Sequence, residues 1–350
     1  MKILFATNSY PPNIGGAEVA SKRIVDILST KHEVTVLTKP TTKKRVLDKE
    51  KQIVELKVYG PYSFMPKLGK FLKENEFDVY ICFGFAKHFF DKMGKFSKKH
   101  GKKSIAIPSG YFHTKKLWIY KKVYEKLILK KSIQNYDCLV NLTKAENEFW
   151  INKFKYPKYK SVIIPHTLEE NYTKFKPTSI LKKHGLKKNK YILYVGRMAK
   201  NKRPDILIKA FNKLKTDLKL VVAGKGTDCD ELKNLKNSQT LLLGSITEDE
   251  KKELIKNCLF FVFPSDFEGY GLVILEALAF NKPILVSDIP VFREIIREKK
   301  FCFKNNTDSL KKKLEEFIKK PIKIKNFKYI NSKEEYLNLI NKVCQRKIKI

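Results

Sequence analysis

The segment KILFATNSYPPNIGGAEVASKRIVDILSTKHEVTVLT, residues 2–38, contains the pattern that decides the fold. Lys2–Thr7 is a short apolar run, which is typical of a parallel strand buried on both faces. Ala17–Ser29 repeats apolar residues at helical spacing, and Glu33–Thr38 is a second β-branched run. Strand, helix and strand in this order predict a βαβ unit that begins an open parallel sheet.

The same alternation continues along the chain and restarts in its second half. Tyr191–Val195 is predicted to be a new first strand, and the helix predicted at Pro204–Leu214 has proline in its first turn, where a missing N–H is harmless. The polar, Lys-rich stretch Thr167–Asn189 is predicted to be a linker. The sequence therefore predicts an α/β protein with two Rossmann-like, doubly wound domains facing across a cleft. The expected ranges are 1–170 for the first domain, 171–330 for the second, and 331–350 for a C-terminal helix that packs back on the first.

Lysine dominates the charge of the chain. Lys and Arg number 73 against 36 Asp and Glu, a formal net charge of +37, so the protein will be attracted to anions. Because the excess is spread over both halves and nearly all of it is Lys, we favour a general surface bias over a dedicated nucleic-acid surface. The composition, 43% hydrophobic and 31% charged, excludes disordered and collagen-like classes.

Cysteine usage and the N-terminus indicate a cytoplasmic protein. The six cysteines form no CxxC pair and several lie in apolar runs, as expected for reduced, buried thiols. MKILFAT lacks the apolar segment and cleavage site of a signal peptide, and no run approaches the 18 apolar residues of a membrane span.

The most informative motif is FPSDFEGYGLVILEALA, Phe263–Ala279. A strand is predicted to end at its start, and a helix to begin near Leu272. The glycines of the loop Gly269-Tyr270-Gly271 let the backbone approach a ligand closely, and the free N–H groups of the helix start point at it. This combination predicts an anion site suited to a diphosphate.

Two carboxylates accompany this loop. Glu268 precedes the helix and Glu276 lies on it, within the otherwise apolar run LVILEALAF. A carboxylate accepts two hydrogen bonds from a vicinal diol, so both suit the hydroxyls of a ribose or a hexose. The alternative is a capping residue and a surface Glu, which explains Glu276 poorly because a charge in an apolar run needs a partner or a ligand.

Two further motifs follow predicted first strands. Gly196-Arg-Met-Ala-Lys-Asn-Lys places Arg197 and Lys202 where they neutralise charge developing on a leaving diphosphate; the alternative is two more basic residues in a basic chain. Tyr10–Glu18 carries Gly15 and Gly16 above a helix start, but it is not the GxGxxG fingerprint and alone is compatible with a simple turn.

Taken together, YPPNIGGAE, GRMAKNKRPDILIKAF and EGYGLVILEALA resemble the retaining glycosyltransferases of family 4, which have the GT-B fold. Their order and spacing match over roughly residues 1–295. The resemblance implies a nucleotide-sugar donor bound mostly by the second domain and an acceptor bound mostly by the first.

The resemblance also implies residue roles. Arg197 and Lys202 would contact the donor diphosphate, Glu268 the donor sugar and Glu276 the ribose, with Gly16 facing the reacting groups. His113, in PSGYFHTK, is the candidate for the histidine that the family often places near acceptor and donor sugar; the alternative is a surface loop histidine. His166 stands where the family often has Asn.

No metal or other cofactor is expected. Asp228-Cys-Asp230 superficially matches a metal-binding DxD, but we interpret it as the polar start of a helix. The GT-B fold characteristically uses side chains and helix ends where other transferases use a metal.

The predicted function is transfer of a hexose-type sugar from a nucleotide-sugar to an acceptor hydroxyl, with retention, in glycolipid, polysaccharide or glycan synthesis. One alternative is a nucleotide-sugar epimerase of the same architecture. The other is a non-enzymatic, basic nucleic-acid-binding protein, although the chain shows no motif of a known nucleic-acid class and no specific nucleic acid is expected.

One basic window suggests a location. Residues 87–131 hold 14 Lys against two acids, and within them KKLWIYKKVYEKLILKK, residues 115–131, interleaves Lys with an apolar stripe. Such a helix lies on an acidic membrane surface, or it packs the stripe on its own sheet with Lys in solvent. The first alternative predicts a peripheral enzyme at the cytosolic face of a membrane and a lipid-linked sugar as acceptor.

Overall fold

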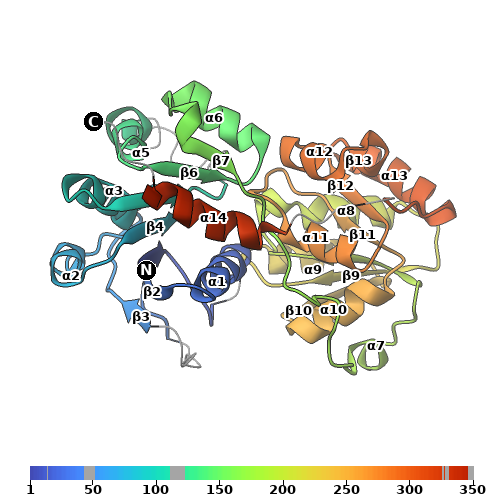
Figure 1. Ribbon diagram of the computed structural model, residues 1–350. Coiled ribbons are helices and arrows are strands. Elements are labelled where there is room, and N and C mark those ends of the chain that lie inside the picture. Colours follow the sequence, from blue (N-terminus) through green and yellow to red (C-terminus); the bar gives the residue numbers. More distant parts are fainter. Residues whose placement is uncertain (14, 43–51, 111–122, 325–326, 328–330, 346–350) are drawn as a thin grey trace. The chain divides into compact units, whose positions relative to one another are not determined.

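The computed structural model describes residues 1–13, 15–42, 52–110, 123–324, 327 and 331–345. The chain forms two compact units. The first unit comprises Met1–Thr167 and the C-terminal segment, and the second unit comprises Leu168–Tyr329. Each unit is built on one parallel sheet, coloured in Figure 1 along the chain.

The first unit has a seven-stranded sheet in the order β3-β2-β1-β4-β5-β6-β7. Every neighbouring pair is parallel, as the buried apolar runs predict. The strands are β1 (Lys2–Thr7), β2 (Glu33–Thr38), β3 (Gln52–Glu55), β4 (Val79–Phe83), β5 (Lys103–Ile107), β6 (Cys138–Asn141) and β7 (Ser161–Ile163).

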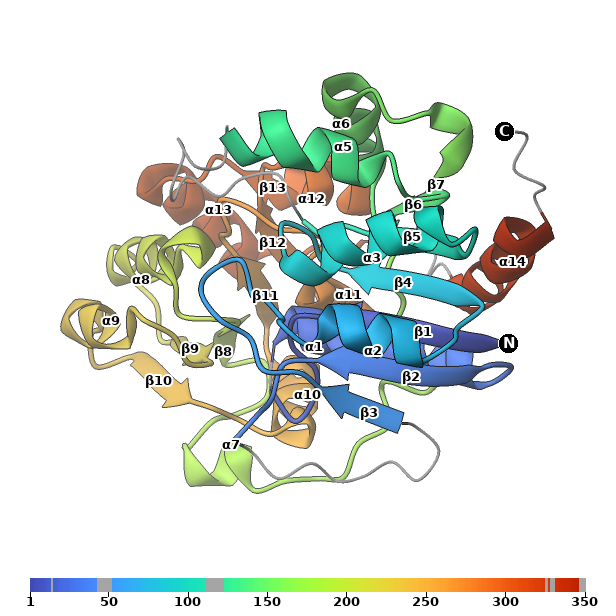
Figure 2. The ribbon, with the colours of Figure 1, turned by 90° about the vertical axis from the view of Figure 1, so that its left-hand side faces the viewer.

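Helices connect these strands and enclose the core of the first unit. They are α1 (Gly16–Ser29), α2 (Leu68–Glu74), α3 (His88–Lys99), the π-helical turn η2 (Glu125–Leu129), α5 (Lys130–Ile133), α6 (Lys144–Phe154), the short turn η3 (Lys158–Lys160) and α14 (Ser332–Gln345). Figure 2 shows α2 and α3 in front of the central strands, and α3 packs on β4 and β5. The C-terminal helix α14 packs against α1. At its start, Ser332 Oγ donates to the carbonyl of Pro165, which follows β7, at 2.5 Å.

The second unit has a six-stranded parallel sheet in the order β10-β9-β8-β11-β12-β13. Its strands are β8 (Tyr191–Val195), β9 (Lys219–Ala223), β10 (Thr240–Gly244), β11 (Phe260–Phe263), β12 (Ile284–Ser287) and β13 (Cys302–Phe303). Its helices are α7 (Ile180–Lys183), α8 (Pro204–Asn212), α9 (Cys229–Leu235), α10 (Glu248–Asn257), α11 (Leu272–Ala279), α12 (Pro290–Ile296) and α13 (Thr307–Lys319), with short turns η4 (Lys200–Lys202) and η5 (Lys299–Phe301).

Two predicted helix starts are confirmed in this unit. Pro204 occupies the first turn of α8. Thr247 and Glu250 also form a complete capping box on α10. Asp228 is the residue before α9, as expected for the polar start of a helix.

The predicted linker Thr167–Asn189 is wrong for most of its length. Only its first residue belongs to the first unit, and Tyr172, Ile180 and Leu186 are buried within the second. Thr178 is held there by Glu253, whose carboxylate accepts from its amide at 2.7 Å. The apolar side chains of this Lys-rich stretch are buried although its composition is polar. The lysines between them make this possible, because their long side chains carry the charge out to solvent.

The two sheets share one topological feature that positions a site. In each, the chain leaves the first strand in one direction and returns on its other side, so the order reverses between β1 and β4 and again between β8 and β11. In open parallel sheets, ligands bind at the carboxyl ends of the strands on either side of such a reversal. The loops that follow β8 and β11 are those of the two sharpest motifs in the sequence.

No helix among the described residues is long and apolar enough to cross a bilayer.

Candidate functional site

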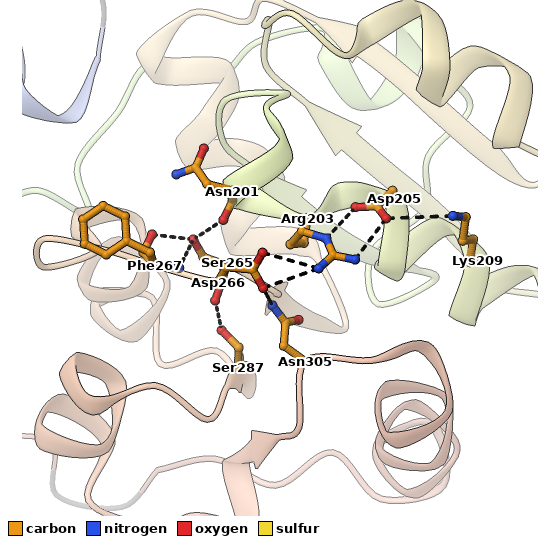
Figure 3. A network of polar contacts seen from close by, with 9 residues as sticks. All are labelled: Asn201, Arg203, Asp205, Lys209, Ser265, Asp266, Phe267, Ser287 and Asn305. Atoms are coloured by element: carbon orange, nitrogen blue, oxygen red, sulfur yellow. Dashed lines mark hydrogen bonds and ion pairs between the residues drawn. The ribbon is translucent and has the colours of Figure 1, made fainter. Parts of the chain in front are cut away.

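The loops after β8 and β11 are joined directly at the reversal point of the second unit (Figure 3). The carbonyl of Asn201 accepts from Ser265 Oγ at 3.0 Å and from the Asp266 amide at 2.9 Å. Ser287, at the end of β12, donates from its hydroxyl to the Ser265 carbonyl. Three consecutive strand ends are therefore fixed relative to one another before any ligand arrives.

Glycines let the loop after β9 press against the loop after β8. A Cβ on Gly224 would lie 1.9 Å from the Gly196 carbonyl oxygen, and one on Gly226 would lie 1.9 Å from that of Met198. The amide of Met198 donates to the Lys225 carbonyl at 3.0 Å. Because any side chain would collide with backbone here, the two glycines set the path of the segment that carries Arg197 and Lys202.

Lys202 and Glu268 form an ion pair across the reversal point. Their side chains are only 20% and 10% exposed, and the Lys202 ammonium lies 5.7 Å from the centre of the Phe263 ring. The structure thus brings together two residues that the sequence assigned to neighbouring parts of one donor. A cation beside a carboxylate can bind a phosphate while the carboxylate accepts from a sugar hydroxyl.

The glycine-rich loop ends in the helix start that the sequence predicts. Gly271 precedes α11 with φ +86°, and a Cβ there would lie 2.8 Å from the Phe292 ring. Within the described residues, no side chain caps this helix and no acid lies in its first turn. The amides of Leu272 and its neighbour therefore remain donors for an anion. Gly269 lies in the loop before the helix, and Tyr270 is buried beside it.

Glu276 is buried on α11 and has a cationic partner that sequence reasoning missed. Lys251 of α10 lies 2.9 Å from its carboxylate and also pairs with Glu248 at 2.8 Å. Burial alone would lower the pKa of Lys251, but the two carboxylates outweigh it and the net shift is upward. The charge in the apolar run thus has a structural partner, and a role toward a ribose would come in addition to it.

A second polar network surrounds Arg203, which also escaped the sequence analysis. Its guanidinium binds Asp205 at 3.1 Å and Asp266 at 3.3 Å, and Asn305 donates to Asp266 at 2.5 Å (Figure 3). Arg203 adopts a left-handed backbone conformation, with φ +52°, between η4 and α8. The signal available in sequence was only an Asp directly before FEG.

A pocket of about 280 Å³ opens beside this network. It does not include Lys202, Glu268 or Glu276, so it neighbours the predicted donor site without coinciding with it. Its lining residues are Lys200, Arg203, Pro204, Asp205, Asp228, Glu231, Leu232 and Asp266.

The other predicted site residues are not part of the Lys202–Glu268 pair or of the network around Arg203. Arg197 is exposed directly after β8, and its carbonyl accepts from the buried Tyr194 hydroxyl at 3.0 Å. Gly16 is the first residue of α1, and open space surrounds the position of a Cβ on it. His113 lies outside the described residues. Among the described residues, no group of three or more His, Cys, Asp and Glu is arranged to hold a metal ion.

Two buried ionisable groups distinguish the first unit. Glu146 accepts from the amides of Leu142 at 2.8 Å and Gly110 at 3.0 Å, and burial raises its pKa to about 7 against these bonds. His166 is buried beside Arg23, and burial followed by that positive charge lowers its pKa to about 3, so its imidazole is neutral at physiological pH.

Comparison with known proteins identifies the class. Residues 178–334 match the model of the family "Glycosyl transferases group 1". The structure of Anabaena HepE in complex with UDP-glucose superimposes with a TM-score of 0.79 at 16% identity, covering 98% of this chain and 100% of that one. The lipopolysaccharide glycosyltransferase WaaG gives a TM-score of 0.72 at 16% identity over 99% and 96% of the two chains. These likenesses show the GT-B fold.

Two curated relatives agree with this class. A Campylobacter jejuni N-acetylgalactosamine-N,N'-diacetylbacillosaminyl-diphospho-undecaprenol 4-alpha-N-acetylgalactosaminyltransferase is 42% identical over 105 residues, which are 29% of this chain and 28% of that enzyme. An uncharacterized glycosyltransferase of Methanocaldococcus jannaschii is 27% identical over 89% of this chain and 87% of its own length. The chain has the GT-B fold of these glycosyltransferases, and its residues 178–334 match the glycosyl transferases group 1 family.

Proposed function

We propose that the protein transfers a hexose-type sugar from a nucleotide-sugar donor to an acceptor hydroxyl with retention of configuration. The observation that carries this proposal is the Lys202–Glu268 pair beside the start of α11. It places a cation, a carboxylate and helix N-terminal amides at the reversal point of one sheet. A sugar diphosphate presents the matching groups, which are two phosphates and a ring of hydroxyls.

In the proposed reaction, the acceptor oxygen forms a bond to the anomeric carbon while the bond from that carbon to the diphosphate oxygen breaks. Lys202, Arg197 and the amides after Gly271 stabilise the negative charge that collects on the departing diphosphate. The acceptor proton passes to that leaving group. No carboxylate is assigned as a covalent nucleophile, so the acceptor attacks from the side on which the diphosphate leaves. The proposal requires no metal, and Glu276 binds the ribose while staying paired with Lys251.

The donor and acceptor classes draw support from the comparisons. HepE is described in complex with UDP-glucose, and the Campylobacter jejuni relative is named for action on a diphospho-undecaprenol-linked sugar. We propose that this chain likewise uses a nucleotide-sugar and a glycan or lipid-linked sugar acceptor. Its place of action would be cytoplasmic, at the cytosolic face of a membrane.

Calorimetry against UDP, GDP, ADP and their sugar conjugates, with and without EDTA, tests the donor proposal. One nucleotide should bind, with unchanged affinity in EDTA, and K202A should weaken it. K213A is the matched control, since Lys213 pairs with exposed Asp308 on the surface of the same unit. Failure of all three nucleotides to bind would refute the proposal. Conversion of the donor sugar to its epimer without acceptor would favour the epimerase instead.

A further inference from the structure

Exposed large apolar side chains are concentrated in two segments of the first unit. Among the described residues, five of the eight such side chains lie either at the hairpin bridged by Tyr59 and Phe64 or on the helical turn at residues 123–133. The eight are Met1, Tyr59, Phe64, Val123, Leu127, Ile128, Tyr159 and Ile322. Clustering of this kind marks an interaction site, whereas single exposed apolar residues do not.

The helical turn η2 with α5 carries two apolar faces. Leu129 and Ile133 are fully buried in the core, so one face packs on its own unit, while residues 115–122 of the predicted stripe lie outside the described residues. Val123, Leu127 and Ile128 face outward and are 51%, 60% and 43% exposed. The unit's own core therefore leaves these three side chains available to a partner.

The two segments are tied together at one carboxylate. Asp91, in the first turn of α3, accepts from the Tyr124 hydroxyl at 2.9 Å and from the Tyr62 hydroxyl. The two tyrosine rings contact edge to face at 6.1 Å. Asp91 thus holds the hairpin and the start of the turn in one place, and its negative charge is satisfied from within the protein.

The charge around these apolar side chains has a single sign. Helix α3 packs beside α5, and exposed lysines line both elements. Glu125, the acid of the adjoining turn η2, is buried and pairs with Lys153 at 2.6 Å. Residues 87–133 contain no arginine. The exposed lysines are Lys92, Lys95, Lys98, Lys99, Lys126, Lys130 and Lys131.

We propose that this docking surface, formed by the Tyr59–Phe64 hairpin, α3 and residues 123–133, binds an anionic lipid bilayer. Leu127 and Ile128 enter the boundary between headgroups and acyl chains while the lysines contact acidic headgroups. A nucleic acid would satisfy the lysines but leave the apolar side chains in water, so the bilayer fits both features. The proposal rests on the surface of the first unit and does not depend on sugar transfer. A bilayer is also the place where a lipid-linked acceptor would be found.

Flotation with vesicles tests the docking surface. The full-length protein should bind phosphatidylcholine vesicles that contain phosphatidylglycerol and not pure phosphatidylcholine vesicles. The double variant L127S/I128S should lose about tenfold in affinity, and K126E/K130E/K131E on the order of a hundredfold. The matched controls are Y159S, an exposed aromatic outside the surface, and K182E/K183E/K187E, the same charge change on exposed lysines of the second unit.

Three outcomes overturn the proposal. These are vesicle binding that the controls weaken as much as the surface variants, binding unaffected by L127S/I128S, and displacement of vesicles by an RNA duplex that binds through the same lysines. All substitutions are at exposed positions, and circular dichroism verifies the fold. Calorimetry with the nucleotide should be unchanged in every variant, so failure of vesicle binding and failure of donor binding are separate results.

Discussion

The first and second units place loops of different chemical character at the same point of similar sheets. After β1 the contacts are neutral: Thr7 Oγ1 donates to the Ser9 carbonyl at 3.1 Å, and Asn13 Nδ2 donates to Ser9 Oγ at 3.2 Å. Ser63 Oγ donates to Asn8 Oδ1 at 2.8 Å. Uncharged donors and acceptors of this kind match hydroxyl groups.

After β8 and β11 the contacts are ionic. Lys202 pairs with Glu268, and Arg203 pairs with Asp266. A diphosphate brings negative charge that must be matched by cations and amides, and these loops supply both. The two sheets therefore share a reversal of strand order, and they differ in the charge of the side chains that follow the strands at that point.

Removing the ammonium group of Lys202 should produce the largest effect on turnover. We expect K202A to lower turnover by about 100- to 1,000-fold, the usual cost of losing one donor to a developing negative charge. Steady-state transfer assays measure this change, with K213A as the surface control. A variant within a few-fold of the wild-type rate would contradict the role of Lys202 and the ionic half of the comparison.

The buried pair in the second unit should show the next largest effect. E276L leaves Lys251 buried with only Glu248 for charge, so the free energy of unfolding should fall by about 3 kcal/mol. E248A removes the exposed partner and should cost less than about 1 kcal/mol. Urea unfolding measures both.

The double variant E276L/K251M separates structure from function at this pair. Replacing a buried ion pair by apolar residues is often neutral for stability, so the double variant should recover most of the loss. If Glu276 also binds the ribose, nucleotide affinity should stay low in this stable protein. Affinity that recovers together with stability would assign Glu276 to folding alone.

Two glycines sharpen the comparison between the units. G271A forces a side chain into φ +86° and against Phe292, so it should destabilise the protein by about 1–3 kcal/mol. G16A meets open space and should be neutral or stabilise by up to about 1 kcal/mol. Thermal unfolding measures both, and lower turnover in a fully stable G16A would support the position assigned to Gly16 at the reacting groups.

The last prediction concerns the pH dependence of stability in the first unit. Burial raises the pKa of Glu146 from its ordinary value of 4.5 to about 7. Between these values the folded state holds a proton that the unfolded state has lost, so stability falls as pH rises, by at most about 1.4 kcal/mol per pH unit. E146Q cannot titrate, and urea unfolding from pH 4.5 to 7 should show a flatter profile than the wild type. An unchanged slope would show that a group other than Glu146 causes the pH dependence of stability.

Local signals predicted the elements of the site but not their contacts. The apolar run of β8 and the proline of α8 each depend on a few consecutive residues, and both are confirmed. Lys251 was missed because TEDEKKEL has the composition of a solvent-exposed helix. Its burial against α11 arises only when two helices separated in sequence pack together.

The glycines of the loop after β9 show the same limit. GKG announces a turn in the sequence, but the reason for glycine is the approach of another backbone segment at Gly196 and Met198. Likewise, the Lys-rich stretch at the start of the second unit has the composition of a linker, although Tyr172, Ile180 and Leu186 in it are buried. In both cases the deciding partner lies far away along the chain.

The order of strands and helices, the parallel sheets and the positions of the charged loops follow from the amino-acid sequence itself, because periodicity, caps and turns are properties of neighbouring residues. Tertiary structure alone decided that Lys202 meets Glu268, that Lys251 meets Glu276, and that Leu127 and Ile128 stay outside the core. Pairing and burial depend on which surfaces come together when the sheets form, and no short stretch of sequence contains that information.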